Sequence, residues 1–240
     1  MKRSITFLCF ALTTSNIAAH ASSNSGYDFF VGSQVGLQNS MHRINNEDKT
    51  VAGIEQKDTH SHKLSGIIGI LAGIQFKTSS SWVLGTDVEL SFAPNKTEEH
   101  TISTPLAGSR NTFRPFKTSY ERDFAIGLGL KAGYSINKIV PYIRLGVEYS
   151  RFTHTFEGQV NLPVSDRVTA SRKYGAWGFV PGIGIDIPLA GYEHVFINME
   201  ARYAFYPSKT INGASISGLT GSSTVKPRFI NLNLGFKVMF

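Results

Sequence analysis

Charged residues of both signs are spaced two apart inside segments that are otherwise apolar or glycine-rich. Asp87 and Glu89 form one such pair, and Glu200 and Arg202 form another. Residues two apart in a β-strand project to the same face, so these charges would share one confined space. A charge in such a space costs free energy unless an opposite charge pairs with it. The predicted members of this charge network are Asp87, Glu89, Lys131, Arg144, Glu148, Asp186, Glu200, Arg202 and Lys237.

The charge network has two functional interpretations. In the first, ion pairs between neighbouring strands fill the interior as a structural plug. The expected pairs join Lys131 to Asp87 or Glu89, and Lys237 to Glu200. In the second interpretation, the same charges line a narrow, gated path for ions.

Residues suited to catalysis or cofactor binding are few. His60, Ser61 and His62 are adjacent, but a serine hydrolase site needs a serine, a histidine and an acid that meet in space. Two histidines at i and i+2 are a weak metal signature. Cys9 is the only cysteine, so the chain beyond it has no thiol nucleophile and no cysteine-ligated metal site. We therefore predict neither an enzyme nor a bound cofactor or metal.

The elements that must position these residues are eight segments in which apolar residues alternate with polar residues or glycine. They are 27–38, 66–76, 82–92, 122–136, 141–153, 177–187, 195–206 and 229–240. Such alternation predicts strands, and runs of about 9–11 residues or more suit tilted strands that cross a bilayer. The connections 77–81, 137–138 and 188–194 are short, and the four others are long. The layout predicts an all-β fold, an eight-stranded antiparallel up-and-down transmembrane β-barrel with both termini on the short-turn side.

The two faces of each segment differ in a way that selects a membrane barrel. Leu232 and Leu234 alternate with Asn231, Asn233 and Gly235, and the other segments repeat this division. Glycine falls on the polar face, where it leaves room for long charged side chains in a narrow lumen. The apolar face is therefore expected to meet lipid.

Aromatic residues near the segment ends predict two girdles at the membrane surfaces. The girdle expected near the short turns contains Tyr27, Phe29, Phe76, Trp82, Tyr134, Tyr142, Phe196 and Phe240. The girdle expected near the long connections contains Phe92, Phe124, Tyr149, Trp177, Phe179, Tyr203, Phe205 and Phe229.

The N-terminus has the pattern of a secretory signal peptide. Lys2 and Arg3 precede a short apolar stretch, 5–12, and an A-x-A cleavage site ends at Ala21. We expect residues 1–21 to be removed and residues 22–240 to form the barrel domain.

Basic residues are concentrated in the long connections. The last of them, 207–228, contains three bases and no acid. Phosphates of lipopolysaccharide are the nearest expected anions, and acidic glycans or another anionic host surface are further candidates. No groove-reading motif accompanies the charge, so a nucleic-acid partner is not expected. The candidate anion-binding residues are Lys96, Arg110, Arg114, Lys117, Arg167, Arg172, Lys173, Lys209, Lys226 and Arg228.

The chain resembles small outer-membrane β-barrel proteins of Gram-negative bacteria, of the OmpA, OmpX and opacity-protein type. The resemblance is carried by Gly182, Gly184 and Asp186, by the segment 141–146 (PYIRLG), and by a C-terminal strand that ends in phenylalanine. In that family the C-terminal pattern resembles the signal read by the barrel-assembly machinery. The matching residues here are Leu232, Leu234, Phe236, Val238 and Phe240.

The resemblance implies location in the bacterial outer membrane and contact with its lipids and lipopolysaccharide. The expected function is that of a surface protein with a structural or adhesin-like role, exerted through its basic extracellular loops. A narrow gated pore and a lipid-modifying outer-membrane enzyme are the alternatives.

Overall fold

The computed structural model describes residues 26–48, 58–93, 97–105, 113–159, 167–192, 194–212 and 221–240. The predicted signal peptide lies outside these ranges. The strands are β1 (Tyr27–Asp48), β2 (Asp58–Lys77), β3 (Trp82–Phe92), β4 (Thr97–Pro105), β5 (Phe113–Tyr134), β6 (Val140–Gln159), β7 (Arg167–Pro188), β8 (Val195–Phe205), β9 (Lys209–Asn212), β10 (Gly221–Lys226) and β11 (Arg228–Met239). In the described ranges, no helix is long and apolar enough to cross a membrane.

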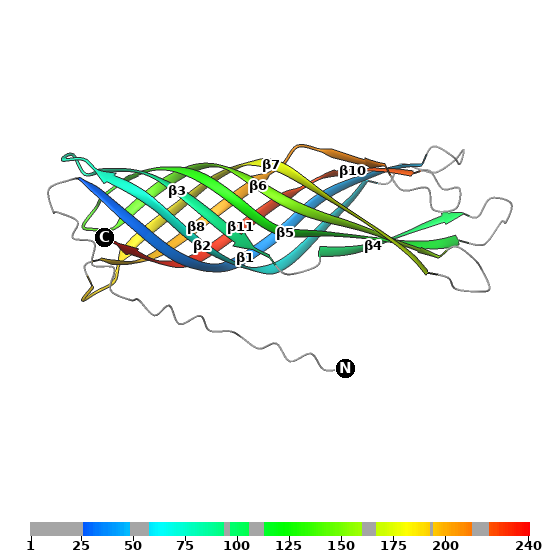
Figure 1. Cartoon of the computed structure of the whole chain (residues 1–240), viewed down its shortest axis with the longest axis horizontal. Coiled ribbons are helices and arrows are strands. Elements are labelled where there is room, and N and C mark those ends of the chain that lie inside the picture. Colours follow the sequence, from blue (N-terminus) through cyan, green and yellow to red (C-terminus); the bar gives the residue numbers. More distant parts are fainter. Residues whose placement is uncertain are drawn as a thin grey trace.

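Eight of these strands close into an antiparallel barrel, as the alternating segments predict. Their order is β11-β8-β7-β6-β5-β3-β2-β1, and β1 pairs again with β11 to complete the circle (Figure 1). The closing ladder runs without interruption from Phe30 opposite Met239 to Ser40 opposite Phe229. Closure leaves no unpaired strand edge in the barrel wall, which a β-structure in a bilayer requires.

Tight turns gather at one end of the barrel. The β2–β3, β5–β6 and β7–β8 connections are the short ones that the sequence predicts, and the C-terminus lies at the same end (Figure 1). Ser81, Asn137 and Lys138 have positive φ angles of 67°, 50° and 71°, which reverse the chain within few residues.

At the opposite end, strand pairing continues far beyond the alternating segments. β1 extends to Asp48, and its ladder with β2 reaches the pair Asn45 and Asp58. β4, β9 and β10 lie wholly within connections that the sequence predicts as loops. Apolar–polar alternation marks only the part of a strand that crosses the lipid, because beyond the bilayer the outward face meets water and no longer needs apolar side chains. The hairpin still satisfies its backbone groups by pairing, so the strand continues after the pattern ends.

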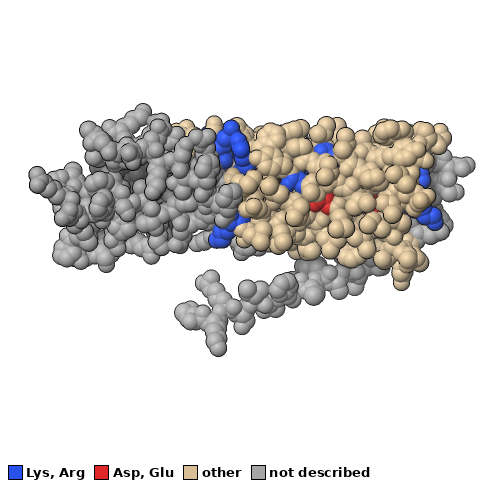
Figure 2. Space-filling model, turned by 180° about the vertical axis from the view of Figure 1, so that it is seen from behind, with Lys and Arg blue, Asp and Glu red and all other residues tan. Residues whose placement is uncertain are grey.

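The barrel wall separates an apolar outside from a polar inside. Outward side chains such as Leu130 and Ile183 are each 64% exposed. The intervening residues point inwards, and many of them are glycine or charged. On the face seen in Figure 2, residues other than Lys, Arg, Asp and Glu cover most of the described surface, and Lys and Arg lie at both ends with a few charged residues between them.

Candidate functional site

The centre of the lumen holds an ion-pair cluster built from three strands. Asp87 of β3 accepts a hydrogen bond from Arg144 Nη2 of β6 at 2.8 Å, and Lys131 Nζ of β5 lies 3.0 Å from its other oxygen. The exposed fractions of the Asp87 and Arg144 side chains are 1% and 2%. The pair between Asp87 and Lys131 is one that the strand spacing predicts.

A second cluster joins the far wall to this centre. Arg202 of β8 pairs with both Glu89 and Glu200. Glu89 also accepts a hydrogen bond from Gln34 Nε2 at 2.6 Å, and Glu200 accepts one from the Tyr142 hydroxyl at 2.5 Å. These contacts connect β1, β3, β6 and β8 across the lumen, so the network ties together strands that are not neighbours.

Lys237 lies nearer the turn end and pairs with Asp186, not with Glu200 as the sequence predicts. Its Nζ is 2.6 Å and 2.8 Å from the two oxygens of Asp186. Asn198 Nδ2 donates to the same carboxylate at 2.7 Å. The prediction considers only adjacent strands, whereas Lys237 on β11 reaches past β8 to β7, which a long side chain can do in a narrow lumen.

Arg122 is a member of the network that the alternation misses. Counting back by twos from Phe124 places Arg122 on the lipid face, yet its side chain is 2% exposed and points inwards. The β5–β6 register shifts between Arg122 and Phe124. A β-bulge there adds one residue, Asp123, and reverses the facing of everything before it. The sequence signal is the charged run 121–123 inside an otherwise regular segment.

Arg122 contacts four residues from three strands, β1, β6 and β11. Its guanidinium donates to Glu148 at 2.8 Å, to Gln38 Oε1 at 2.9 Å and to Ser150 Oγ at 3.1 Å. It also lies 5.1 Å from the centre of the Phe229 ring. With Arg122 included, the charged side chains of the described lumen that are at most about 10% exposed are five acids and five bases, so their formal charge is balanced. They are Asp87, Glu89, Glu148, Asp186, Glu200, Arg122, Lys131, Arg144, Arg202 and Lys237.

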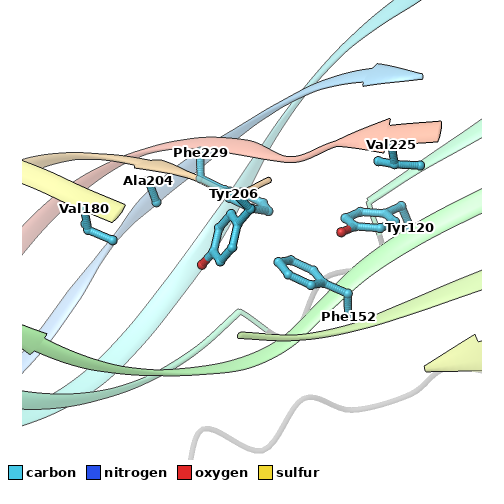
Figure 3. Packing of buried hydrophobic residues seen from close by; sticks show 7 residues of the cluster. All are labelled: Tyr120, Phe152, Val180, Ala204, Tyr206, Val225 and Phe229. Atoms are coloured by element: carbon cyan, nitrogen blue, oxygen red, sulfur yellow. The ribbon is translucent and has the colours of Figure 1, made fainter. Parts of the chain in front are cut away.

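An apolar cluster, shown in Figure 3, adjoins the network where Tyr206 contacts Glu148 and Phe229 contacts Arg122. Phe152 stacks on Phe229 at 6.1 Å between ring centres and meets Tyr206 edge-on at 5.1 Å. The buried members of this apolar cluster are Tyr120, Phe152, Val180, Ala204, Tyr206, Val225 and Phe229. A smaller cluster of Phe30, Leu71 and Met239 lies at the turn end, with Phe196 packed against it.

The inward packing corrects the predicted girdles at three positions. Phe229 is fully buried, Tyr142 is 6% exposed, and Phe196 packs inside the barrel. Phe229 shares the inward phase of Asn231, so its position in the alternation would have placed it correctly. Trp82 and Trp177 do face outwards, with exposed fractions of 51% and 65%.

Glycines provide the space that the inward side chains occupy. A Cβ on Gly129 would overlap the Arg144 guanidinium, and one on Gly184 would overlap the Tyr142 ring. A Cβ on Gly178 would lie 2.7 Å from Tyr206 Cε1. Glycine is therefore needed at these positions because a large side chain from a neighbouring strand fills the volume.

The candidate anion-binding residues fall into three groups. Lys96 and Arg110 lie outside the described residues. The backbones of Arg114, Lys117 and Arg167 are in strands, but their side chains lie outside those that the structure describes, as do the side chains of His60, Ser61 and His62. Those with exposed, described side chains are Arg172, Lys173, Lys209, Lys226 and Arg228.

The C-terminal residues complete the barrel wall. Leu232, Leu234 and Phe236 face outwards and are half-exposed, and Val238 shares their phase. Phe240 extends the closing ladder, since its N–H donates to Phe29 O at 2.8 Å and its own carbonyl accepts from Phe29 N at 3.3 Å.

A sequence model of the outer membrane protein beta-barrel domain matches residues 6–240. The chain belongs to this family. As a member of the outer membrane protein beta-barrel domain family, it is an outer-membrane β-barrel protein, and the fold expected from the alternation is confirmed. No curated protein sequence matches the chain.

Solved structures of similar proteins are outer-membrane barrels. OprG of Pseudomonas aeruginosa is 19% identical with a TM-score of 0.47, over 89% of this chain and 96% of that chain. Neisserial surface protein A is 13% identical with a TM-score of 0.40, over 88% and 97%. Ail, the attachment invasion locus protein of Yersinia pestis, is 9% identical with a TM-score of 0.33, over 85% and 97%.

Proposed function

We propose that this barrel is a non-conducting surface protein with a structural or adhesin-like role, exerted through the basic residues on its extracellular side. The observation that carries the proposal is the filled lumen. Acids and bases balance there, and the pair between Arg202 of β8 and Glu89 of β3 joins strands on opposite sides of the lumen. An ion that entered would have to separate these pairs, which costs several kcal/mol for each buried charge left without a partner.

The exposed bases suggest the partner. Arg228 lies opposite Phe205, an outward aromatic residue near the end of the barrel that holds the long hairpins. Lys226 is exposed two residues before it, and Lys209 is exposed on the adjoining β9. Aromatic residues of a membrane barrel mark the headgroup level, so bases beside them lie where lipopolysaccharide carries its phosphates. We therefore take the phosphates of lipopolysaccharide as the primary ligand of these bases.

The binding test compares the wild-type barrel with the variant Lys209→Gln/Lys226→Gln/Arg228→Gln. The variant should fold normally, because surface substitutions usually change stability by about 0.5 kcal/mol or less. It should bind lipopolysaccharide more weakly, and wild-type binding should fall with added salt, because exposed charges are screened over about 8–10 Å. The charge-conserving variant Lys209→Arg/Lys226→Arg/Arg228→Lys is the matched control and should leave binding largely unchanged.

Two further measurements complete the test. Binding to heparin-like glycans under the same conditions shows whether acidic glycans compete for the same bases. Planar-bilayer recordings should show no single-channel current from the wild-type barrel. Regular current steps would support the gated-pore alternative, and lipopolysaccharide binding that ignores both salt and the triple substitution would contradict the electrostatic account.

A further inference from the structure

The outer wall of the barrel has a groove of about 820 Å³ near the turn end. Its lining comes from six neighbouring strands, β3, β5, β6, β7, β8 and β11. One wall follows residues that lie directly opposite one another in the ladders, from Ala132 through Ile143, Ile183 and Ala201 to Leu232. The groove therefore runs across the strands, not along them.

The floor of the groove is bare backbone. Tyr142, Gly184 and Glu200 lie opposite one another in the next row, and side chains in this row point into the lumen. Two of the outward residues that line the groove, Ala132 and Ala201, have only a methyl side chain. They leave the groove shallower walls there than the larger residues beside them do. Filling the groove requires an apolar molecule, since its walls are hydrocarbon.

The length and inclination of the groove match one leaflet of a bilayer. Five steps of about 4.8 Å separate β3 from β11, which gives a path of about 24 Å. With strands tilted by roughly 35–45°, a path perpendicular to them rises about 16 Å along the membrane normal. The hydrocarbon core is about 30 Å thick, so one leaflet accounts for about 15 Å of it.

The foot of the groove has the chemistry of a lipid headgroup site. Trp82 and Tyr134 meet edge-on at 5.6 Å, and Ser135 N donates to Ser81 O at 2.8 Å, which ties two turns together. Lys77 ends β2 opposite Val83, the neighbour of Trp82, and Lys138 lies in the β5–β6 connection; both are exposed. Two cations beside an aromatic pair at the membrane edge are complementary to an anionic phosphate.

We propose that this groove is a binding site for a phospholipid of the periplasmic leaflet. An acyl chain lies in the groove from Trp82 towards Leu232, and its phosphate lies between Lys77 and Lys138. The ligand class is an anionic glycerophospholipid such as phosphatidylglycerol. The site is independent of the extracellular bases, because it lies at the opposite end of the barrel.

Tryptophan fluorescence provides the test, because the chain has two tryptophans. With Trp177→Phe, Trp82 reports on the foot of the groove. The full barrel is reconstituted in phosphatidylcholine bilayers that contain phosphatidylglycerol with brominated chains. Quenching of Trp82 should exceed the value set by the bulk mole fraction, with a preference of about fivefold for each lysine, since a base near the surface contributes about 1 kcal/mol.

Variants separate a specific site from general lipid contact. Lys77→Gln/Lys138→Gln should abolish the preference, whereas Lys226→Gln/Arg228→Gln, at the other end, should leave it intact. Ala132→Phe/Ala201→Phe fills the groove and should reduce quenching even with both lysines present. If the phenylalanine variant does not fold, the lysine pair still decides the question. Quenching of Trp82 that follows the bulk mole fraction of phosphatidylglycerol in the wild type would overturn the proposal.

Discussion

Arg122 Nη2 lies 2.8 Å from Glu148 Oε1 in the lumen, and the two side chains are 2% and 8% exposed. The pair exists because the bulge at Asp123 turns Arg122 inwards. Without that one extra residue, Glu148 would face the lumen without the cation that balances it. The bulge is therefore a structural element of the charge network.

Removing one member of this pair should cost more than removing both. Arg122→Met leaves the Glu148 carboxylate buried without its cation, which is expected to destabilise the barrel by about 3–5 kcal/mol. In Arg122→Met/Glu148→Leu no charge is stranded, so the loss should be much smaller. Urea unfolding in lipid vesicles measures both. A double variant as unstable as the single one would show that the ion pair itself is not the main contribution.

Two glycines of β5 should respond differently to the same substitution. A Cβ on Gly129 overlaps the Arg144 guanidinium, which Asp87 holds in place, whereas a Cβ on Gly127 would lie 3.5 Å from Glu148 Cβ in ordinary contact. Gly129→Ala should therefore destabilise the barrel by about 1–3 kcal/mol. Gly127→Ala should be neutral or slightly stabilising. Equal unfolding midpoints for the two variants would contradict this account of the lumen glycines.

His154 should make the extracellular end of the barrel sensitive to acid. It lies on β6 beyond the aromatic pair Tyr149 and Trp177, outside the lipid-facing band, and is fully buried. Burial lowers the pKa of His154 from 6.5 to about 4. The folded protein thus binds the proton that would charge His154 more weakly than the unfolded chain does. The contribution of neutral His154 to the stability of the folded barrel is therefore complete above pH 6.5. It is lost as the pH falls towards 4.

The expected loss of stability from protonation of His154 is at most roughly 3–4 kcal/mol. Hydrogen exchange of the β5–β6–β7 amides at neutral and acidic pH should detect it as faster local opening in acid. His154→Phe keeps an aromatic ring among Tyr120 and its neighbours but cannot titrate. The acid-induced change should shrink in this variant, and an unchanged pH dependence would assign the effect to other groups.

Phe240 should be needed for assembly. It provides the last backbone bonds of the closing β1–β11 ladder, and its ring is 40% exposed towards the lipid. Deleting Phe240 should lower the amount of barrel in the outer membrane and leave periplasmic chain that proteases degrade. The matched variant Phe240→Trp keeps an aromatic end and should assemble. Normal levels of the deletion variant would show that the barrel-assembly machinery does not depend on this residue.

Local sequence determined the wall of this barrel. Period-two alternation fixes which residues of 82–92 or 229–240 face lipid, because a strand has only two faces and the bilayer accepts only apolar side chains on one of them. The short connections fix neighbouring strands and hence the antiparallel order. For the same reason the pair between Asp87 and Lys131 could be expected from spacing alone, since β3 and β5 are adjacent.

Tertiary structure decided the contacts across the lumen and the strand ends. Lys237 pairs with Asp186 on a strand two places away, and Arg202 pairs with both Glu89 and Glu200. These contacts form because side chains in a narrow interior can reach several strands. A one-residue bulge gives no signal in a period-two pattern except its break, so the alternation places Arg122 on the lipid face whereas the structure turns it inwards. Outside the bilayer the outward face meets water and needs no apolar side chains, so the alternation ends there although backbone pairing carries the hairpins further.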